Sequence, residues 1–283
     1  RLLSSSILQS IQNDAVSKLS HYQYGIGVSG GAEIIPRQAQ LFHDLHLLQP
    51  NSRAGIISLD AKNAFNTISR QAIFDEILLL FPSLARYFAL THGQDSNIYD
   101  KFGNYVYKCT TGVKQGDPLG PLLFSIGLNR ALASFSERAR QQNFSIDTSS
   151  STSLHKLSSF LDDMSVLTLD LPSFAPAIDV LIECLRSVDL SINKVKSKVL
   201  LSNPSLSESL STVGIPYCRD GLEILGVPIG APQYISTWLE NYFNPIQSLF
   251  GLTRHLRHDC QYLCLRFSLA AKSNFLMRCL PPS

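Results

Sequence analysis

Two neighbouring carboxylates, Asp162 and Asp163, are the residues whose types and spacing point most directly to chemistry. Residues 157–160 and 165–169 flank them and can form two strands, so we expect the pair at or beside a tight hairpin turn. Adjacent strand residues point to opposite faces, but the bend at a turn relaxes this rule enough for both carboxylates to approach one site. Two adjacent anions repel each other, and a hard cation such as Mg²⁺ suits them. The alternative is a solvated surface turn with no bound cation. Taken by itself, this stretch of sequence favours that alternative.

Two further stretches place polar residues where the chain changes direction. A short strand over residues 54–59 ends on Asp60. The turn Gln115-Gly116-Asp117-Pro118 is expected to open a helix, because aspartate is a good N-cap and proline a good first helical residue. Lys194, Lys196 and Lys198 are spaced by two, so they would share one face if the chain there were extended.

The elements that must position these residues follow from apolar periodicity, caps and turn signals. Hairpins are expected around Gly103-Asn104, around the Asp162-Asp163 pair and within residues 221–230. Helices are expected over residues 7–19 and 32–48, from Ser69 to 81, from Ser83 to 92, and over 118–140, 174–188 and most of 233–277.

A glycine-rich loop over residues 25–33 formally contains G-x-G-x-x-G. No hydrophobic strand precedes it, as the dinucleotide-binding fingerprint requires, so we reject that interpretation. The loop instead leads into a helix whose first free N–H groups can bind phosphate. A plain helix-capping loop is an equally good interpretation.

Composition sets broad limits. The chain has 283 residues and 45% hydrophobic content, enough for a sizeable core or two to three subdomains. A net charge of +2 does not by itself indicate a nucleic-acid-binding protein, so a basic groove would need local clustering. The six cysteines form no C-x-x-C pair, no apolar run could span a bilayer, and no secretory signal opens the chain, so an intracellular protein with reduced thiols is expected. The first residue, Arg1, suggests a fragment.

These stretches together resemble the reverse transcriptase family, most closely that of non-LTR retrotransposons. Motifs A, B and C in this order are highly specific, whereas any one alone would be weak. The resemblance covers nearly the whole chain and includes the loop at 25–33, which is similar to a fingers motif. The matching stretches are Leu-Asp-Ala-Lys-Asn-Ala-Phe-Asn at 59–66 (motif A), residues 112–124 around Gln-Gly-Asp-Pro (motif B), Phe-Leu-Asp-Asp at 160–163 (motif C), Asn-Lys-Val-Lys-Ser at 193–197 (motif D) and Leu-Gly-Val-Pro-Ile-Gly at 225–230 (motif E, the primer grip).

The resemblance implies an α+β fold of the right-hand polymerase type, with a palm made of a small antiparallel sheet backed by helices. It implies partial fingers over residues 1–53, a palm segment with motif A over 54–80 and a fingers insertion over 81–115. The palm would continue over 116–230 with motifs B to E, and 231–283 would be the start of a helical thumb.

The implied activity is RNA-directed DNA polymerisation by two Mg²⁺ ions, with Mn²⁺ as a possible substitute. Asp60 and Asp162 would be metal ligands, with Asp163 beside them. The partners would be an RNA template, a DNA primer and dNTPs, without a membrane. The protein would reside in the nucleus or in a cytoplasmic ribonucleoprotein.

The resemblance also assigns residues to the incoming nucleotide. Ala61, Gln115 and Gly116 would lie against it, since a missing side chain permits close approach. Phe65, five residues after Asp60, is where the family places the residue that blocks a 2′-OH; simple core packing is the alternative.

Two further roles concern the leaving group and the primer. Lys196 could donate a proton to pyrophosphate, although a solvated or phosphate-binding lysine is equally consistent with the sequence. Leu225 and Gly226 would belong to the primer grip.

Departures from the family pattern are few. Phe160 stands where the family usually has tyrosine, and we expect a modest effect because the metal ligands remain. Asp189 stands where the family often has glycine, and aspartate tolerates a left-handed conformation better than most residues. From the comparison with the family pattern we expect the chain to lack the earlier fingers motif and most of the thumb, and we expect no endonuclease or ribonuclease H region in it.

Two other functions stay open. The first is an inactive polymerase-like fragment that only binds RNA or serves as a scaffold; the three aspartates argue against it and truncation argues for it. The second is an RNA-templated RNA polymerase on the same palm, against which Phe65 and the Phe-Leu-Asp-Asp turn favour DNA synthesis.

Overall fold

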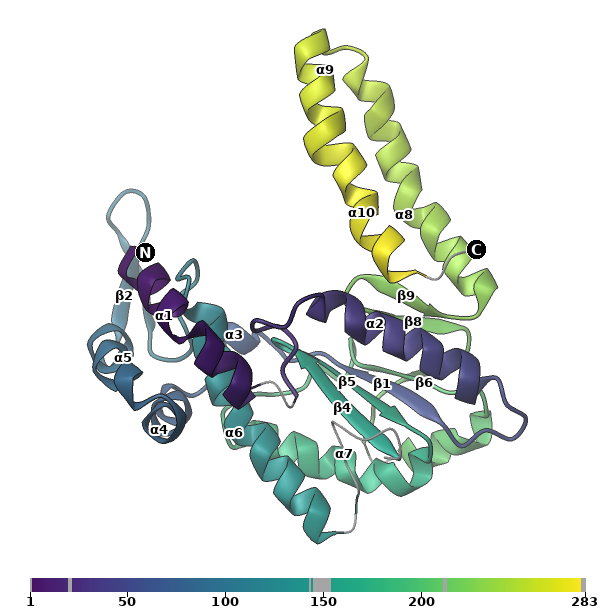
Figure 1. The fold of residues 1–283 in the computed structure, drawn as a ribbon, viewed down its shortest axis with the longest axis horizontal. Coiled ribbons are helices and arrows are strands. Elements are labelled where there is room, and N and C mark those ends of the chain that lie inside the picture. The colour runs from purple at the N-terminus through teal and green to yellow at the C-terminus, as the bar shows by residue number, and fades with distance from the viewer. Residues whose placement is uncertain (1, 20–21, 143, 145–153, 211–212, 281–283) are drawn as a thin grey trace.

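A five-stranded sheet forms the centre of the computed structural model, which describes residues 2–19, 22–142, 144, 154–210 and 213–280 (Figure 1). The strand order is β4-β5-β1-β6-β7. Neighbours pair antiparallel except β6 and β7, which are parallel. The expected α+β fold with a small palm sheet backed by helices is confirmed. The sheet was expected to be antiparallel, and the parallel pair of β6 and β7 departs from that expectation. The strands are β1 (Gly55–Leu59), β4 (His155–Phe160), β5 (Asp163–Thr168), β6 (Lys198–Leu200) and β7 (Tyr217–Cys218).

Alternation along the strands buries both faces of the sheet. Ile57 lies opposite Val166 and Val199 in the register, and all three belong to one core. The next residue, Ile56, lies opposite Leu167 and Leu200, which belong to a second core. Because successive strand residues point to opposite faces, each face carries its own apolar row and needs its own cover.

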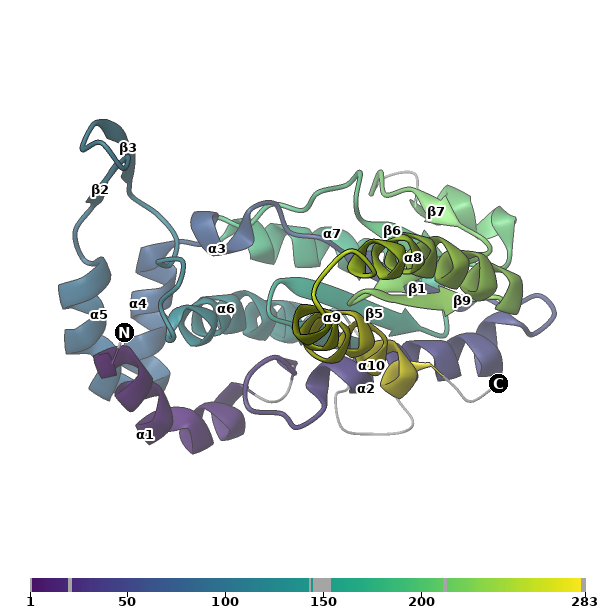
Figure 2. The ribbon, with the colours of Figure 1, turned by 90° about the horizontal axis from the view of Figure 1, so that it is seen from above.

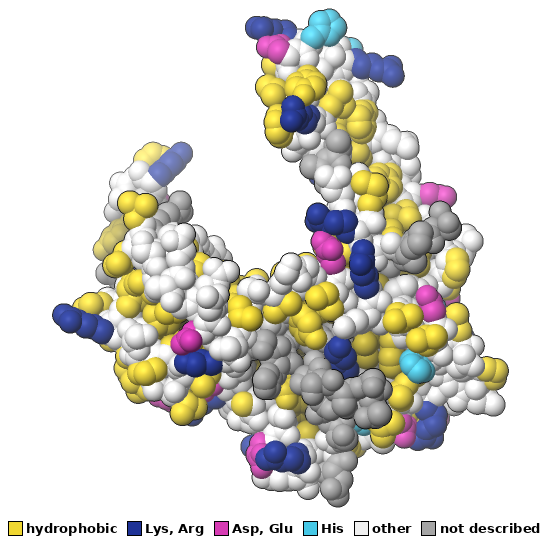
Figure 3. Space-filling view, viewed as in Figure 1, with side chains coloured by type: hydrophobic (Ala, Val, Ile, Leu, Met, Phe, Trp, Pro, Cys, Tyr) yellow, Lys and Arg dark blue, Asp and Glu magenta, His cyan; other side chains and the backbone are white. Residues whose placement is uncertain are grey.

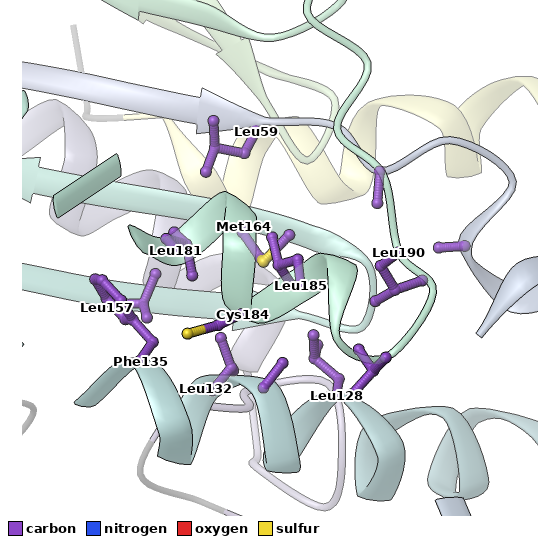
Figure 4. Packing of buried hydrophobic residues seen from close by; sticks show 14 of the residues in the cluster. Leu59, Leu128, Leu132, Phe135, Leu157, Met164, Leu181, Cys184, Leu185 and Leu190 are labelled. Carbon is purple, nitrogen blue, oxygen red and sulfur yellow. The ribbon is translucent and has the colours of Figure 1, made fainter. Parts of the chain in front are cut away.

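Two helices, α6 (Gly120–Gln141) and α7 (Leu171–Arg186), cover the first face. Figure 4 shows Leu59, Leu157 and Met164 of the sheet facing side chains of both helices, among them Phe135 and Leu181. The second face is covered by α2 (Gly31–Phe42), its continuation in a π-helical turn (His43–Leu47), and a hairpin of β8 (Gly221–Ile224) and β9 (Val227–Gly230).

The remaining elements stand on either side of this palm (Figures 1 and 2). Figure 3 shows an open hollow between the group formed by residues 2–19 and 70–109 and the group formed by residues 232–279. No helix in the described ranges is long and apolar enough to cross a membrane. The domain boundaries given above stay a prediction. One group comprises α1 (Leu2–Leu19), α4 (Arg70–Leu80), α5 (Ala85–His92), β2 (Ser96–Tyr99) and β3 (Tyr105–Cys109); short α3 (Ala64–Thr67) follows β1; the other group comprises α8 (Pro232–Thr253), α9 (His258–Cys264), a π-helical turn (Leu265–Leu269) and α10 (Ala270–Cys279).

Local signals succeeded at some helix starts and failed at others. Ser69 caps α4 by accepting from the backbone N–H of Ala72, as expected. The predicted start of α6 at Pro118 was wrong, because Asp117 instead accepts the N–H of Leu119 in a turn that precedes the helix. The predicted cap at Ser83 was also wrong, since a 3₁₀ turn, Pro82–Leu84, occupies this segment before α5.

The prediction that three lysines share one extended face was wrong. Residues 194–196 form a turn, and pairing with β1 begins only at Lys198. Val195 is consequently 84% exposed, whereas Val199 is fully buried. The three lysines therefore do not alternate along one extended strand.

One buried histidine makes the stability of the fold depend on pH. His92, at the end of α5, is 2% exposed, its ring stacks on Phe88, and its Nε2 lacks a hydrogen-bond partner among the described residues. Burial, and then the positive charges of Lys114 and Arg70, lower the pKa of His92 from 6.5 to about 4. Between pH 6.5 and about 4 the unfolded chain therefore binds a proton at this residue that the folded chain does not bind, so the free energy of unfolding decreases as the pH is lowered.

We expect this histidine to contribute ~3 kcal/mol of unfolding free energy at pH 7 that is lost as the pH falls toward 4. His92→Phe should keep the ring stack and flatten the pH dependence in that window. Urea unfolding at several pH values measures it, with the exposed His258→Phe as control. An unchanged slope in His92→Phe would contradict the assignment.

Candidate active site

Asp60 follows the last residue of β1, and the chain around residues 191–197 holds its backbone. The N–H of Asn193 donates to the carbonyl of Asp60 at 2.7 Å, and the N–H of Asp60 donates to Ser197 Oγ at 3.0 Å. Ser197 is fully buried, so this contact is shielded from water. Two residues of the motif D stretch thereby fix the position from which the Asp60 side chain projects.

Asp162 and Asp163 lie at the turn between β4 and β5. Phe160 pairs with Asp163, so Leu161 and Asp162 form a two-residue turn. Leu161 has a φ of 55°, a left-handed conformation that is unusual for a large side chain. The hairpin register places this turn beside the end of β1, because Met164 pairs with Leu59.

Two pockets meet at Asp60, and Lys196 also lines both. The first, here the hairpin pocket, has a volume of about 370 Å³ and is lined by Asp163 and by the β8–β9 turn at Leu225 and Gly226. The second, here the loop pocket, has a volume of about 490 Å³ and is lined by residues 60–66, Gln115, Asp162, Asn193 and Lys196.

The expectation that Asp162 and Asp163 approach a single site is therefore only partly met. Asp163 lines the hairpin pocket and Asp162 the loop pocket, with Asp60 between them. In the described part of the chain, no three His, Cys, Asp or Glu side chains are grouped so that they could hold a metal ion.

The three carboxylates nevertheless interact electrostatically, and this interaction affects the pKa values of Asp162 and Asp163. Burial is the main cause that raises the pKa of Asp162 above its usual value, and the charge of Asp60 adds to it. Asp163 as a residue is exposed, and its carboxylate is only partly buried where it lines the hairpin pocket. This partial burial, with repulsion from Asp162 and Asp60, raises the pKa of Asp163 to about 6. Such crowding of anions suits a cation.

The loop pocket is shaped by contacts between the segments of motifs A and B. The N–H of Val113 donates to the carbonyl of Phe65 at 2.9 Å, and Gln115 Nε2 reaches Asn66 Oδ1 at 3.4 Å. The Phe65 ring lines the pocket and also stacks on the fully buried Phe124, with centroids 4.4 Å apart. The ring is thus both a pocket wall and a packing residue.

Gly112 explains why these two segments lie so close. Its φ is 70°, and a Cβ there would lie 2.5 Å from the backbone of Phe65 and Asn66. Only glycine meets both demands, so the motif B segment can pack directly on the chain after Asp60.

The β8–β9 hairpin is held over the hairpin pocket by helix α2. Gln40 is buried and clamps Gly230 from both sides: its Nε2 donates to the Gly230 carbonyl, and its Oε1 accepts the Gly230 N–H at 3.0 Å. The two turn residues, Leu225 and Gly226, both have positive φ. On the outer side, Trp238 Nε1 of α8 donates to Glu223 at 3.1 Å.

The two departures from the family pattern have physical counterparts here. Asp189 has a φ of 62°, so the expected left-handed turn before the motif D stretch is confirmed. Phe160 packs, partly buried, against the second core, where its ring needs no hydroxyl.

Most of the residues predicted from the sequence line one of the two pockets. Lys196 lines both, Leu225 and Gly226 line the hairpin pocket, and Ala61, Phe65 and Gln115 line the loop pocket. Gly116 lines neither. Sequence reasoning missed Asn193 and Ser197 as holders of Asp60, and it missed the polar row formed by Ser58 and Ser165, which pair across β1 and β5 in the hairpin pocket. The serines gave no signal, because isolated serines occur throughout the chain.

Comparisons with known proteins agree with this geometry. The family profile described as "Reverse transcriptase (RNA-dependent DNA polymerase)" matches residues 1–229. The "Retrotransposable element SLACS 132 kDa protein" of Trypanosoma brucei gambiense is 30% identical over 149 residues, which is 51% of this chain and 11% of that protein.

Solved telomerase structures share the fold. The telomerase from Candida albicans in complex with a TWJ fragment of telomeric RNA aligns with a TM-score of 0.55 at 14% identity, over 80% of this chain and 36% of that chain. The apo telomerase from Candida tropicalis aligns with a TM-score of 0.53 at 12% identity, over 80% of this chain and 39% of that chain. At these identities the likeness concerns the fold alone.

Proposed function

Because this chain belongs to the reverse transcriptase family, we propose that it is the core of a retroelement RNA-directed DNA polymerase, which extends a primer 3′-OH with dNTPs on an RNA template. One observation carries the proposal. Asp60 stands between two pockets, each of which contains one further carboxylate, Asp163 or Asp162. A nucleotidyl transfer needs two such neighbouring spaces, one for the primer end and one for the triphosphate.

We assign the hairpin pocket to the primer end and the loop pocket to the incoming dNTP. Leu225 and Gly226 would contact the primer backbone, because their turn borders the hairpin pocket. Ala61, Gln115 and Phe65 would enclose the base and sugar of the nucleotide. Gly116, next to Gln115, would let the backbone approach the nucleotide closely.

The crowded carboxylates fit hard divalent cations. Asp60, Asp162 and Asp163 offer only oxygen donors, and the pKa of Asp163 is raised first by burial and then by repulsion from the other two carboxylates, which a cation would relieve. Mg²⁺, or Mn²⁺ as a substitute, would be held by pairs of these carboxylates, Asp60 with Asp163 on the side of the hairpin pocket and Asp60 with Asp162 on the side of the loop pocket. When bound, these ions neutralise the charge that develops on the reacting oxygens.

Primer extension tests the proposal. The purified chain is given an RNA template with an annealed DNA primer and Mg²⁺, first with dNTPs and then with rNTPs. We expect DNA products that follow the template and little extension with rNTPs. A preference for rNTPs would identify an RNA polymerase instead.

One observation favours a second candidate, an inactive polymerase-like domain that only binds RNA. Among the described residues no three potential ligands are grouped for a metal ion. Retained RNA binding without extension under any metal or nucleotide condition would support this candidate and contradict the first.

Lys196 provides a prediction on the leaving group, since it lines both pockets beside Asp60. Lys196→Leu is expected to lower the rate of dNTP incorporation by about 10²-fold or more, in the range typical of a lost proton donor, and to weaken primer-template binding less. Single-turnover incorporation and filter binding measure the two effects. Lys194→Leu is the matched control, because Lys194 lies outside both pockets. If binding falls in step with rate and the salt dependence becomes shallower, Lys196 only contacts phosphate.

A further inference from the structure

Gln23 is a buried polar residue in the segment between α1 and α2, and only 3% of its surface is exposed. Its neighbours pair with β4 through an isolated parallel β-bridge. The N–H of Tyr24 donates to the Ser159 carbonyl, and the N–H of Ser159 donates to the Tyr22 carbonyl, each at 2.7 Å. This pairing carries Gln23 to the base of the turn that bears Asp162.

The side-chain amide of Gln23 binds both backbone groups of Leu161. Its Oε1 accepts the N–H of Leu161 at 2.7 Å and that of Gly25 at 2.9 Å. Its Nε2 donates to the Leu161 carbonyl at 3.4 Å and to Ser159 Oγ at 3.2 Å. Ser159 Oγ donates to the same carbonyl at 2.8 Å. The whole hydrogen-bonding capacity of the Leu161 backbone is therefore used within this buried group.

These hydrogen bonds hold Leu161 in a left-handed backbone conformation that leucine rarely adopts. For a residue with a side chain, the left-handed region is unfavourable, and such strain persists only where the surroundings enforce it. The glycine loop closes over the same turn. A Cβ at Gly25 would lie 2.8 Å from Gln23 Oε1 and 2.9 Å from Leu161 Cγ. Leu161 directly precedes Asp162, so a change in its φ would redirect the carboxylate that follows.

We propose that Gln23 is a positioning residue that locks Leu161 in its left-handed conformation and thereby aims Asp162 and Asp163 at the two pockets that meet at Asp60. This inference rests on the proposed function for its catalytic consequence. It also assigns the glycine loop a role other than dinucleotide binding or helix capping alone. Gly25 leaves room for the hydrogen bonds between Gln23 and Leu161, here called the clamp.

A double-mutant cycle tests the proposal, because glycine adopts positive φ without penalty. Gln23→Met keeps the length of the side chain and removes its polar atoms. In the parent we expect it to lower kcat for dNTP incorporation about tenfold or more, as misplaced reacting groups do, and to change KM for dNTP less than threefold. In a Leu161→Gly background, where no strain needs to be enforced, we expect the same substitution to lower kcat less than threefold.

Gln23→Glu is the second variant, should Gln23→Met fail to fold. It retains the acceptor for the N–H of Leu161 and loses the donor to the Leu161 carbonyl, so an intermediate loss is expected. Thermal melting of every variant separates misfolding from mispositioning. An equal loss of kcat in the parent and in the Leu161→Gly background, or no loss in a folded variant, would overturn the clamp.

Mn²⁺ binding, followed by electron paramagnetic resonance, keeps this test distinct from the proposed function. If the parent chain extends no primer, the proposed function fails, and the Mn²⁺ affinity decides on the clamp. A loss of affinity in Gln23→Met that disappears in the Leu161→Gly background supports positioning of the carboxylates, whereas unchanged affinity refutes it. A parent chain that neither extends primers nor binds Mn²⁺ overturns both inferences.

Discussion

Asp162→Asn is expected to lower primer extension by about 10³-fold or more, since stabilising the charge of the transition state through a metal ion is worth several kcal/mol. The metal-free protein should nevertheless be as stable as the parent or more stable. The pKa of Asp162 is raised in the folded state by burial and by the charge of Asp60, so ionised Asp162 opposes folding. Asparagine removes that opposition and keeps the shape of the side chain.

The pH dependence has a definite sign. A carboxyl whose folded pKa lies above its unfolded value costs stability above that folded pKa, and the cost disappears once both states are protonated, below about pH 4. The gain from Asp162→Asn should therefore be present at neutral pH and vanish in acid. Mg²⁺ should raise the melting temperature of the parent and have less effect on the variant.

Calorimetry with and without Mg²⁺, together with primer extension, measures these effects. Asp179→Asn is the matched control, because Asp179 is an exposed residue of α7 and lines neither pocket. Extension at the parental rate in Asp162→Asn would refute the catalytic role.

Phe65→Val is expected to raise the ratio of kcat/KM for rNTPs to that for dNTPs by roughly 10–200-fold, which corresponds to 1–3 kcal/mol of mismatch against a 2′-OH. Phe65 lines the loop pocket a few residues after Asp60. If its ring lies under the ribose, a 2′-OH would meet an apolar ring with no hydrogen-bond partner and too little room. Valine would open that space while dNTP use stays mostly intact.

The stacking of Phe65 on Phe124 makes a folding control necessary. Phe74→Val is matched, because Phe74 also stacks on a buried phenylalanine, Phe88, but lies outside both pockets. Thermal melting and steady-state kinetics of both variants separate the two roles. A constant rNTP to dNTP ratio together with lost stability would make Phe65 a core residue and nothing more.

The local features of this site were readable from the sequence because they depend on neighbouring residues. The apolar run before Asp60 predicts a strand that leads directly into that residue, and β1 ends at Leu59, immediately before it. The short apolar arms around Asp162 and Asp163 predict a hairpin, and the tolerance of aspartate for left-handed backbone predicts the φ of Asp189. Motif order then indicated the family and the palm.

Helix starts and the lysine stretch were less predictable. Aspartate is a residue type that favours the N-cap position, but Asp117 lies in a turn before the helix. The reason is that the motif B segment first packs on the chain after Asp60. The alternating lysines fit an extended strand by pattern alone. Instead, the N–H of Asn193 donates to the Asp60 carbonyl, Ser197 Oγ accepts the N–H of Asp60, and residues 194–196 between these two contacts form a turn.

The sequence by itself determined the identity of the three carboxylates, their places at strand ends and turns, and the α+β fold around them. Only the tertiary structure decided that Asp163 and Asp162 face different pockets with Asp60 between them. Only the tertiary structure also shows that Gln23 contacts Leu161, which is 138 residues away in the sequence. The physical reason is that these contacts depend on which segments pack side by side, and a buried amide finds its partners only after the sheet, the glycine loop and the hairpin have come together.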